Sequence, residues 1–247
     1  MNQTIEHQLN HRSHRIFTDK AVSADIIDTL VEVALRTSTH MHMQAWSIIR
    51  VTDQEKRRSL ADIMRQSNVA AMPELWIFLV DCRRNLEIAR QQGYIGQAGA
   101  TLDRFMQGYI DACIAAQNVL TAVESLGMGG VFLGAIARDY KGTCEILGLP
   151  ELTFPAIGLG FGYPAREVLL KPRLPREFRV FENEYKDPFE NISELNDFDV
   201  ELEHYYDQCE PGRQDAAFSK KVYKHMSQTF PDHSTLLEEL QSQGFII

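Results

Sequence analysis

The stretch between residues 101 and 126 constrains the fold of this chain more than any other. Its large apolar side chains recur at steps of three and four residues, which is the spacing of one helix face. Apolar or small residues also cover most of its remaining circumference, so we expect a long helix that runs through the middle of the fold instead of over its surface. Gly127 can adopt the left-handed conformation that ends such a helix.

The segments around this helix predict a protein with both helices and strands. Ser23 is placed to cap a helix that follows it, and residues 53–66 have helical composition. Short runs of β-branched and aromatic residues predict buried strands at 46–51, 75–81, 131–136 and 154–164. Glycines occupy alternate positions in the last run, so one strand face is bare and a helix or a flat ligand can approach it closely.

Charge and hydropathy exclude several functions. The 247 residues include 25 Lys and Arg against 34 Asp and Glu, and this net charge of −9 argues against an extended surface for nucleic acid or for an anionic membrane. No run approaches the about 18 to 20 apolar residues that cross a bilayer, and the first residues lack the apolar core of a secretory signal. We therefore expect a soluble, cytoplasmic protein with no nucleic-acid or membrane partner.

The chain changes character after residue 180. It is strongly acidic there, and short amphipathic helices are predicted at 218–226 and 234–245. The segment has too little aliphatic content for a core of its own, so we expect it to pack on the main body or on a partner subunit.

Two basic clusters stand out in this acidic chain. Residues 11–15 read HRSHR, and Lys171 and Arg173 flank a proline that stiffens an extended segment. Arginine presents a planar fork of donors that matches a phosphate, so the two clusters together could hold one. Surface salt bridges to the acidic tail are the alternative. The GMGG of residues 127–130 follows a helix instead of a strand, so it fails as a dinucleotide fingerprint, although its exposed amides remain available to a ligand.

The connection at residues 38–46 joins a predicted helix to a predicted strand and carries His40 and His42. No third ligand stands at a spacing that would complete a metal site, so we predict no metal. Gln66 ends an apolar segment, where it has either a capping role or a ligand contact. No hydrolytic motif with a nucleophile is present.

Four motifs stand in the order of a known family: HRSHRIFTDKAVS, MQAWSIIRVTDQEKR, AQNVLTAVESLGMGGVFLGAI and LKPRLP. Together they resemble the oxygen-insensitive nitroreductase and flavin reductase family, and most of all its NADPH-dependent branch. The resemblance implies an α+β fold with a mixed, mainly antiparallel sheet and helices packed around a long central helix. It also implies a homodimer with FMN at the interface. In this organisation residues 1–180 form the FMN-binding core, and residues 181–247 form a domain-swapped extension around the partner, within one domain overall.

The resemblance also implies which residues bind the cofactor. The residues of this chain that match the family's flavin contacts are His11, Arg12, Ser13, Arg15, Ser38, Thr39, Gln66, Gly129, Gly130, Lys171 and Arg173. Glycine at 129 and 130 suits a flat ring stacked on the main chain, which leaves no room for Cβ. Arg213 is the basic residue near the family's NAD(P)H contacts, which favours NADPH over NADH as the electron donor.

The chain departs from the family pattern in three places. His40 and His42 stand where close relatives carry hydroxyl side chains, which bears on flavin potential or substrate choice. His14 replaces an apolar residue, and neither the pattern nor a physical argument accounts for it. Residues 82–105 match poorly.

The implied activity is that of an FMN-dependent NAD(P)H oxidoreductase with a ping-pong mechanism. Hydride passes to flavin N5 and then to a nitroaromatic, a quinone or free flavin, and no catalytic side chain is assigned because the cofactor carries the chemistry. The alternatives are a flavin-binding carrier or sensor with little turnover, and a structural α/β protein whose basic clusters pair only with its acidic tail.

Overall fold

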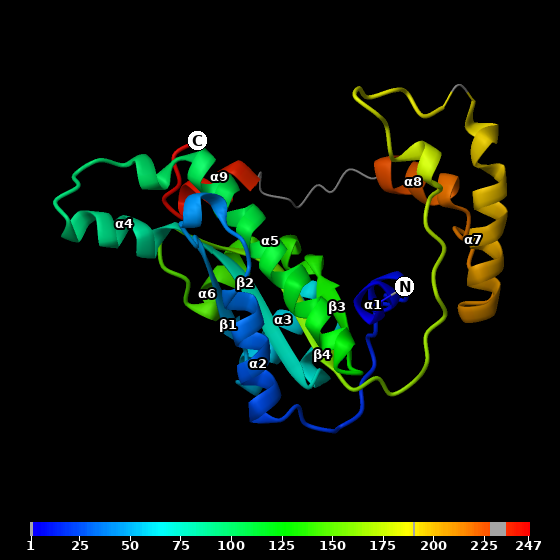
Figure 1. Cartoon of the computed structure of the whole chain (residues 1–247), viewed down its shortest axis with the longest axis horizontal. Coiled ribbons are helices and arrows are strands. Elements are labelled where there is room, and N and C mark those ends of the chain that lie inside the picture. Colours follow the sequence, from blue (N-terminus) through cyan, green and yellow to red (C-terminus); the bar gives the residue numbers. More distant parts are fainter. Residues whose placement is uncertain (1, 190, 228–235) are drawn as a thin grey trace. The chain divides into compact units, whose positions relative to one another are not determined.

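The long helix and the strands around it belong to the first of two compact units. The structure is a computed structural model that describes residues 2–189, 191–227 and 236–247 (Figure 1). The first unit comprises Met1–Val168 with His233–Ile247, and the second comprises Leu169–Asp232. Within the described residues, no helix has both the length and the apolar character needed to cross a membrane.

A sheet of four strands forms the centre of the first unit. The strands are β1 (Trp46–Arg50), β2 (Glu74–Asp81), β3 (Gly129–Leu133) and β4 (Thr153–Gly162). Their order is β1-β2-β4-β3, and each neighbouring pair is antiparallel. This arrangement confirms the predicted α+β class with a mainly antiparallel sheet.

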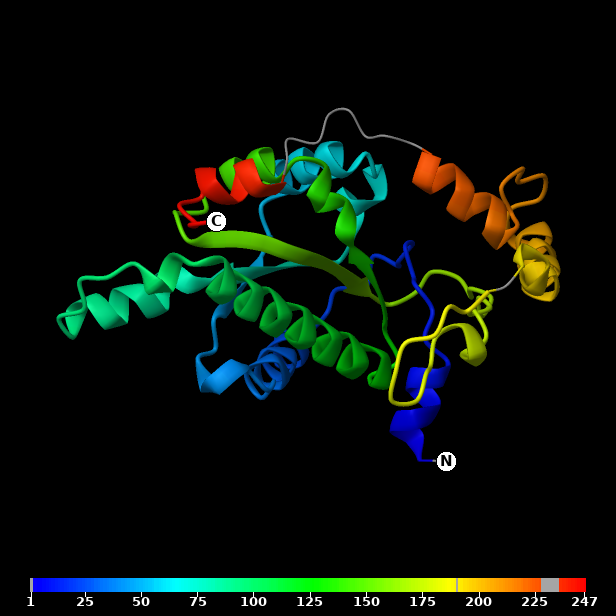
Figure 2. The same cartoon turned by 90° about the horizontal axis from the view of Figure 1, so that it is seen from above.

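Helices cover both faces of this sheet (Figure 2). The helices of the unit are α1 (Gln3–Leu9), α2 (Ala24–Leu35), α3 (Gln54–Met64), α4 (Cys82–Gln91), α5 (Leu102–Ser125), α6 (Tyr140–Leu147) and α9 (Leu236–Ser242). Short 3-10 turns are η1 (His40–His42), η2 (Ser67–Ala71), η3 (Ala98–Ala100) and η4 (Gly134–Arg138). α2 and α5 pack on one face of the sheet, and α3 and α6 pack on the other.

Strand β2 shows why the sheet needs both layers. Trp76 and Phe78 pack toward α2 and α5, while Leu75 and Ile77 pack toward α3. Successive side chains of a strand point to opposite faces, so a strand buried on both faces reads as an uninterrupted apolar run. The continuous apolar sequence at 75–80 is therefore explained by helices on both sides.

Helix α5 lies unusually close to the strands because its sheet-facing residues are small. Ala112, Ala115 and Ala116 are fully buried, and a Cβ added at Gly108 would lie 2.6 Å from the carbonyl oxygen of Ala45. The predicted long helix is confirmed, but in the single chain it covers one face of the sheet instead of running through the middle. Its outer stripe stays at least 36% exposed, and these residues form it: Leu102, Met106, Ile110 and Ile114.

The alternate glycines of β4 are covered by protein. A Cβ at Gly160 would collide with the sulfur of Met72, and one at Gly162 would lie 2.6 Å from Cγ of Pro73. The sequence predicts a helix or a flat ligand at this bare face, whereas the structure has there the chain segment that joins η2 to β2.

The second unit is small and mostly helical. It contains η5 (Arg176–Phe178), η6 (Ile192–Leu195), α7 (Asn196–Cys209) and α8 (Phe218–Ser227). Leu202, Tyr206 and Ala216 form its buried cluster, and the rings of Phe198 and Phe218 meet edge to face at 5.4 Å.

The predicted strands and the long helix agree with the structure to within a few residues at each end. α4, α6 and α7 were not predicted. Part of the helix predicted at 234–245 lies outside the described residues, and the rest is α9, whose Leu240 and the following Phe245 pack in the first unit beside Phe105. The second compact unit therefore begins at Leu169, before residue 180, and the last residues of the chain belong to the first unit. The wrapping of residues 181–247 around a partner stays a prediction.

Candidate functional site

The loop from Ser38 to Gln44 has a strained backbone. Met41, His42 and Gln44 have φ values of 49°, 60° and 50°, in the left-handed region that side chains other than glycine disfavour. Each such residue costs on the order of 1–2 kcal/mol, and such residues cluster at functional sites. The surrounding protein must therefore hold this loop in place.

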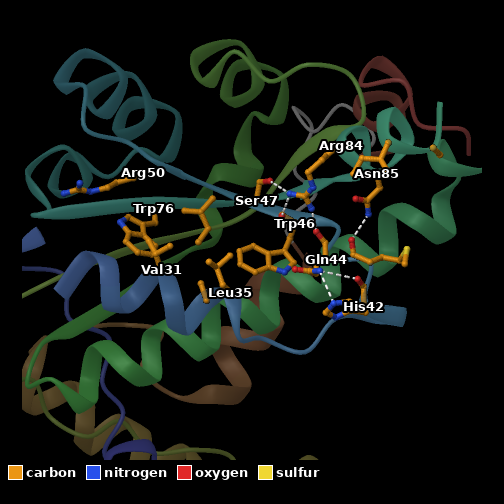
Figure 3. A pocket seen from close by; sticks show the side chains of 15 residues that line it. Val31, Leu35, His42, Gln44, Trp46, Ser47, Arg50, Trp76, Arg84 and Asn85 are labelled. Atoms are coloured by element: carbon orange, nitrogen blue, oxygen red, sulfur yellow. Dashed lines mark hydrogen bonds between the residues drawn. The ribbon is translucent and has the colours of Figure 1, made fainter. Parts of the chain in front are cut away.

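Side chains of α4 and α5 hold the loop through hydrogen bonds. Asp111 of α5 accepts hydrogen bonds from the backbone N–H of His40 at 3.0 Å and from its Nδ1 at 2.9 Å. From α4, Asn85 donates to the carbonyl oxygen of Met43 at 2.7 Å, and Arg84 donates to that of Gln44 (Figure 3). The loop is thus anchored to two helices that follow it in the sequence by 40 to 70 residues.

A large groove lies beside this loop, between α2, β1 and α4 (Figure 3). Its volume is about 860 Å³, and Trp46, Trp76 and Leu35 are among its apolar walls. The charges of its two arginines are already balanced by carboxylates. The guanidinium of Arg50 donates two hydrogen bonds to the carboxylate of Glu74, at 2.6 and 2.7 Å, and that of Arg84 lies 3.5 Å from the carboxylate of Asp81. No predicted cofactor residue lines the groove, so its size alone does not identify it as the site.

The basic segment 11–15 runs beside the first residues of β3. The backbone N–H of His14 donates to the carbonyl oxygen of Gly130 at 3.0 Å, and Ser13 bridges to the same residue. Nδ1 of His11 is 2.6 Å from a carboxylate oxygen of Glu124, at the end of α5. The predicted residues at 11–15 and at 129–130 are therefore brought together.

The two arginines of this segment have no carboxylate partner within the described part of the first unit. Arg12 donates through Nη1 to the carbonyl oxygen of Asn10 at 3.1 Å, and Arg15 makes only a long contact of 3.5 Å with that of Ser13. Nε of Arg12 is buried without a hydrogen-bond partner. A buried cationic donor is costly unless something accepts from it, so these side chains fit an anion such as a phosphate. The salt-bridge alternative finds no partner in this unit.

His14 packs against Gly129. A Cβ on Gly129 would lie 2.5 Å from Cδ2 of His14, and a Cβ on Gly130 would lie 2.7 Å from Cδ1 of Leu120. Protein atoms therefore fill the space that the sequence argument reserved for a flat ring at these two glycines. Burial lowers the pKa of His14, so the ring is neutral near pH 7 and takes the place of the family's apolar residue, although its buried Nδ1 has no partner among the described residues.

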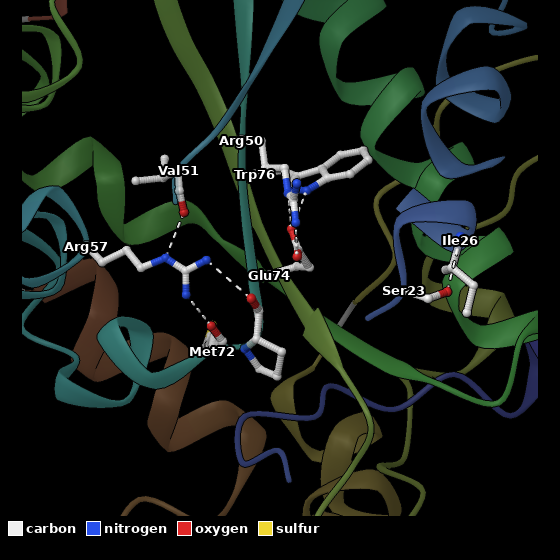
Figure 4. A network of polar contacts seen from close by, with 9 residues as sticks. Ser23, Ile26, Arg50, Val51, Arg57, Met72, Glu74 and Trp76 are labelled. Atoms are coloured by element: carbon white, nitrogen blue, oxygen red, sulfur yellow. Dashed lines mark hydrogen bonds and ion pairs between the residues drawn. The ribbon is translucent and has the colours of Figure 1, made fainter. Parts of the chain in front are cut away.

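Gln66 precedes η2, which reaches the same cluster. Asn68 of η2 donates to the carbonyl oxygen of Arg15 at 3.2 Å. Arg57 of α3 holds this part of the chain: only 6% exposed, it donates to the carbonyl oxygens of Val51, Met72 and Pro73 at 2.7, 2.5 and 3.2 Å (Figure 4). Because those carbonyls flank α3 and η2 on either side, this one guanidinium fixes the segment that carries Gln66.

Lys171 and Arg173 belong to the second unit, so their joint action with Arg12 and Arg15 stays a prediction. Nζ of Lys171 lies 2.5 Å from the hydroxyl of Tyr206. Burial alone would raise the pKa of Tyr206, but this ammonium and that of Lys221 lower it on balance.

A cavity of about 420 Å³ in this unit is lined by both predicted cations and by two that the sequence argument missed, Arg179 and Lys221. Sequence spacing could not have grouped them, because α8 brings Lys221 back over a gap of 50 residues.

Arg213 is in a different electrostatic setting from these cations. It donates to Glu210 at 2.5 Å and to Asp215 at 2.9 Å, and its guanidinium stacks 4.3 Å from the ring centre of Tyr206. Two carboxylates already satisfy its charge, so a phosphate would have to displace them.

Ser38 and Thr39 are not brought to the cluster at 11–15 within one chain. Both segments are anchored to α5, one through Asp111 and the other through Glu124. These anchors are 13 residues apart, which corresponds to about 20 Å along a helix axis. Asp111 itself was missed by the sequence argument, although a carboxylate on the buried face of an apolar helix is a recognisable signal.

Among the residues that the structure describes, no group of three or more His, Cys, Asp or Glu side chains is placed to hold a metal ion.

Comparisons with known proteins agree with this geometry. The model of the Nitroreductase family matches residues 9–163, and that of the Nitroreductase family, C-terminal domain, matches residues 171–247. The chain is 36% identical to FMN reductase (NADPH) of Bacillus subtilis (strain 168), over 99% of both chains. It is 38% identical to the oxygen-insensitive NADPH nitroreductase of Salmonella typhimurium, over 83% of both. The solved structure of NADPH:FMN oxidoreductase from Vibrio harveyi, complexed with NAD+, superimposes with a TM-score of 0.86 at 32% identity and covers 99% of both chains.

The antiparallel sheet lies between helix layers and has an arginine-bearing segment beside its edge strand β3, which defines an α+β protein with a candidate anion site. With two family models that together span most of its length, the chain belongs to the nitroreductase family.

The packing of His14 on Gly129 leads to a stability test. We expect Gly129→Ala to lower the free energy of unfolding by about 1–3 kcal/mol, because the added methyl group overlaps the imidazole. The same change in a His14→Ala background should cost less than half as much. Urea unfolding of the wild type, the two single variants and the double variant measures both costs. Gly134→Ala, where nothing lies within 4 Å of the new methyl group, is the matched control and should change stability by no more than about 0.5 kcal/mol. Equal costs of Gly129→Ala in both backgrounds would refute this packing account.

Proposed function

We propose that this protein is an FMN-dependent NAD(P)H oxidoreductase that reduces nitroaromatics, quinones or free flavin by a ping-pong mechanism. The observation that carries the proposal is the pair Arg12 and Arg15, which have no carboxylate partner among the described residues of their unit and lie beside the first residues of β3. Membership of the nitroreductase family supports FMN as the phosphate-bearing ligand of this cluster.

The chain's own residues would bind and orient this cofactor. Arg12, Ser13 and Arg15 would hold the phosphate and ribityl chain, together with Lys171 and Arg173 from the second unit, and His11 would be oriented by Glu124. Gln66 would contact the ring system from the segment that Arg57 fixes. Bound FMN supplies the two-electron chemistry, and nearby cations favour its anionic reduced form.

The proposal includes a homodimer in which each flavin contacts two copies. A flavin held at residues 11–15 would meet Ser38 and Thr39 of the partner subunit, because the two segments contact α5 at points about 20 Å apart. The exposed apolar stripe of α5 supports a dimer contact, since apolar patches of this kind mark interaction surfaces.

NADPH is the proposed electron donor. Arg213 is a weak candidate for its additional phosphate, because Glu210 and Asp215 already neutralise it. Lys221 and Arg179 have no carboxylate within ion-pair distance among the described residues of their unit, so these two cations, and not Lys171 and Arg173 on the same cavity, are our candidates for the additional phosphate.

The activity itself is tested by a spectrum. The purified protein should be yellow, and its flavin absorbance should bleach when NADPH is added without oxygen and return when menadione follows. Slower bleaching with NADH would agree with the assigned donor. A flavin that binds but is not reduced by either nucleotide would favour the carrier or sensor alternative, and a protein that binds no added FMN would overturn the proposal.

The anion site is tested by Arg15→Ala. We expect the dissociation constant of FMN to rise about tenfold to a hundredfold, as for one charge-assisted hydrogen bond, while the thermal stability of the apoprotein changes little. Quenching of flavin fluorescence measures the first quantity and thermal unfolding the second. Arg58→Ala, at an exposed position on α3, is the control and should leave both unchanged. Loss of apoprotein stability with unaltered FMN affinity would instead place Arg15 in a salt bridge.

A further inference from the structure

We propose that His40, held by Asp111, is a catalytic residue that donates a proton to the acceptor as it is reduced. The inference rests on the proposed function, because it concerns the step in which a quinone or a nitroaromatic takes electrons from the reduced flavin. It adds an acid group to a mechanism for which the sequence suggested none.

The geometry of the pair determines which nitrogen of His40 is available. Asp111 is 1% exposed and accepts from both the backbone N–H and Nδ1 of His40, at 3.0 and 2.9 Å. A carboxylate only accepts hydrogen bonds, so Nδ1 carries a proton and Nε2 is the free nitrogen. Nε2 has no hydrogen-bond partner among the described residues, and 42% of the His40 side chain is exposed. The carboxylate orients the imidazole and stabilises its protonated form, as in other carboxylate–histidine pairs.

The loop that carries His40 is held in a costly conformation. Residues with left-handed backbone angles follow it at positions 41, 42 and 44, and Asn85 and Arg84 donate to the carbonyl oxygens of Met43 and Gln44. A loop that needed only an anchor could relax to ordinary backbone angles. Strain that the surrounding structure enforces is a feature of sites where a side chain must be placed accurately.

A cavity of about 300 Å³ adjoins the pair and gives an acceptor room to bind. His40 and Asp111 line it, together with Arg104 and Gln107 of α5 and Asn85 of α4. Arg104 donates to the side-chain oxygen of Gln107 at 2.8 Å and has no carboxylate partner in the described part of its unit, so it can also bind an acceptor oxygen. Apolar side chains form much of the remaining lining. The cavity suits a small aromatic ring that bears an oxygen acceptor.

Much of this cavity is built by residues 82–105. These are the residues that match the family pattern poorly, and His40 stands where relatives carry a hydroxyl.

The proton balances the reduction. A quinone takes a hydride from the reduced flavin at one oxygen and a proton from Nε2 of protonated His40 at the other, which yields the hydroquinone. A nitro group takes the same hydride and proton and loses one oxygen as water, which yields the nitroso product. His40 is left neutral and regains its proton from solvent through its exposed edge.

The acceptor step should therefore depend on pH through His40. The ionisable groups that line the cavity with it are Asp111, Arg104, Tyr94 and Cys82, and His42 lies on the same loop. Burial raises the pKa of the Cys82 thiol to about 12, so Cys82 stays neutral over the tested range. A step that takes its proton from His40 should slow as the pH rises.

His40→Asn separates the catalytic role from an anchoring one. The amide nitrogen of Asn occupies the place of Nδ1 and continues to donate to Asp111, but it carries no titrating proton. In stopped-flow experiments we expect NADPH to reduce the flavin at the wild-type rate and menadione to reoxidise it about 100-fold more slowly, without the pH dependence. Reoxidation by ferricyanide, which takes electrons only, should be unchanged. His204→Asn, at an exposed position of α7, is the control and should behave as wild type.

A measurement on the apoprotein checks the pair without any turnover. Nitrogen-15 NMR of the histidines should show His40 protonated at Nδ1 in its neutral form, and Asp111→Asn should weaken this tautomer preference. An unprotonated Nδ1, or reoxidation of His40→Asn by menadione at the wild-type rate, would overturn the inference alone. If NADPH does not reduce the wild-type flavin, the proposed function fails as well.

Discussion

The close packing of α5 on the sheet is the constraint on which the other features depend. Its buried face consists of Gly108 and a series of alanines, and Gly108 has no room for even a methyl group. Because the helix lies so near the strands, polar groups at its surface meet fixed partners from distant parts of the chain. Asp111 thereby holds the strained loop at 38–44, and Glu124 holds His11 beside β3.

This arrangement anchors two sets of candidate ligand-binding residues at distant points of one helix. The anchors differ by 13 residues, or about 20 Å along the axis, and the apolar stripe of α5 at residues 102–114 faces outward. A site assembled from two copies would explain both features. Packing α5 against a second subunit would bury its exposed apolar residues, and it would let one flavin reach residues 11–15 of one copy and residues 38–44 of the other. The groove beside α2, β1 and α4, whose arginines are already paired, is a poorer candidate than the cluster at residues 11–15, whose arginines have no carboxylate partner in the described part of their unit.

Much of the fold follows from sequence patterns, whereas the contacts that shape the site do not. The periodicity of residues 101–126 and the apolar runs predict α5 and the four strands, and the charge of residues 11–15 predicts an anion site. The left-handed backbone of Met41 and His42 has no such signal, because sequence patterns place that conformation at glycine. His14 was unexplained until its ring was found against Gly129, more than 100 residues away. α4 and α7 were missed because they are largely polar and are stabilised by contacts that a local pattern does not encode.

Pairing two defective copies would test most directly whether one flavin is bound by two subunits. Arg15→Ala impairs one half of the site and Thr39→Glu the other, and the two variants can be coexpressed with different tags so that the mixed dimer is isolated. If each site combines residues 11–15 of one copy with the 38–44 loop of the other, the mixed dimer contains one intact site and should bind one FMN, while neither parent dimer binds it at the same concentration. A mixed dimer that binds no FMN would contradict this account, because it would place both halves of each site in a single chain.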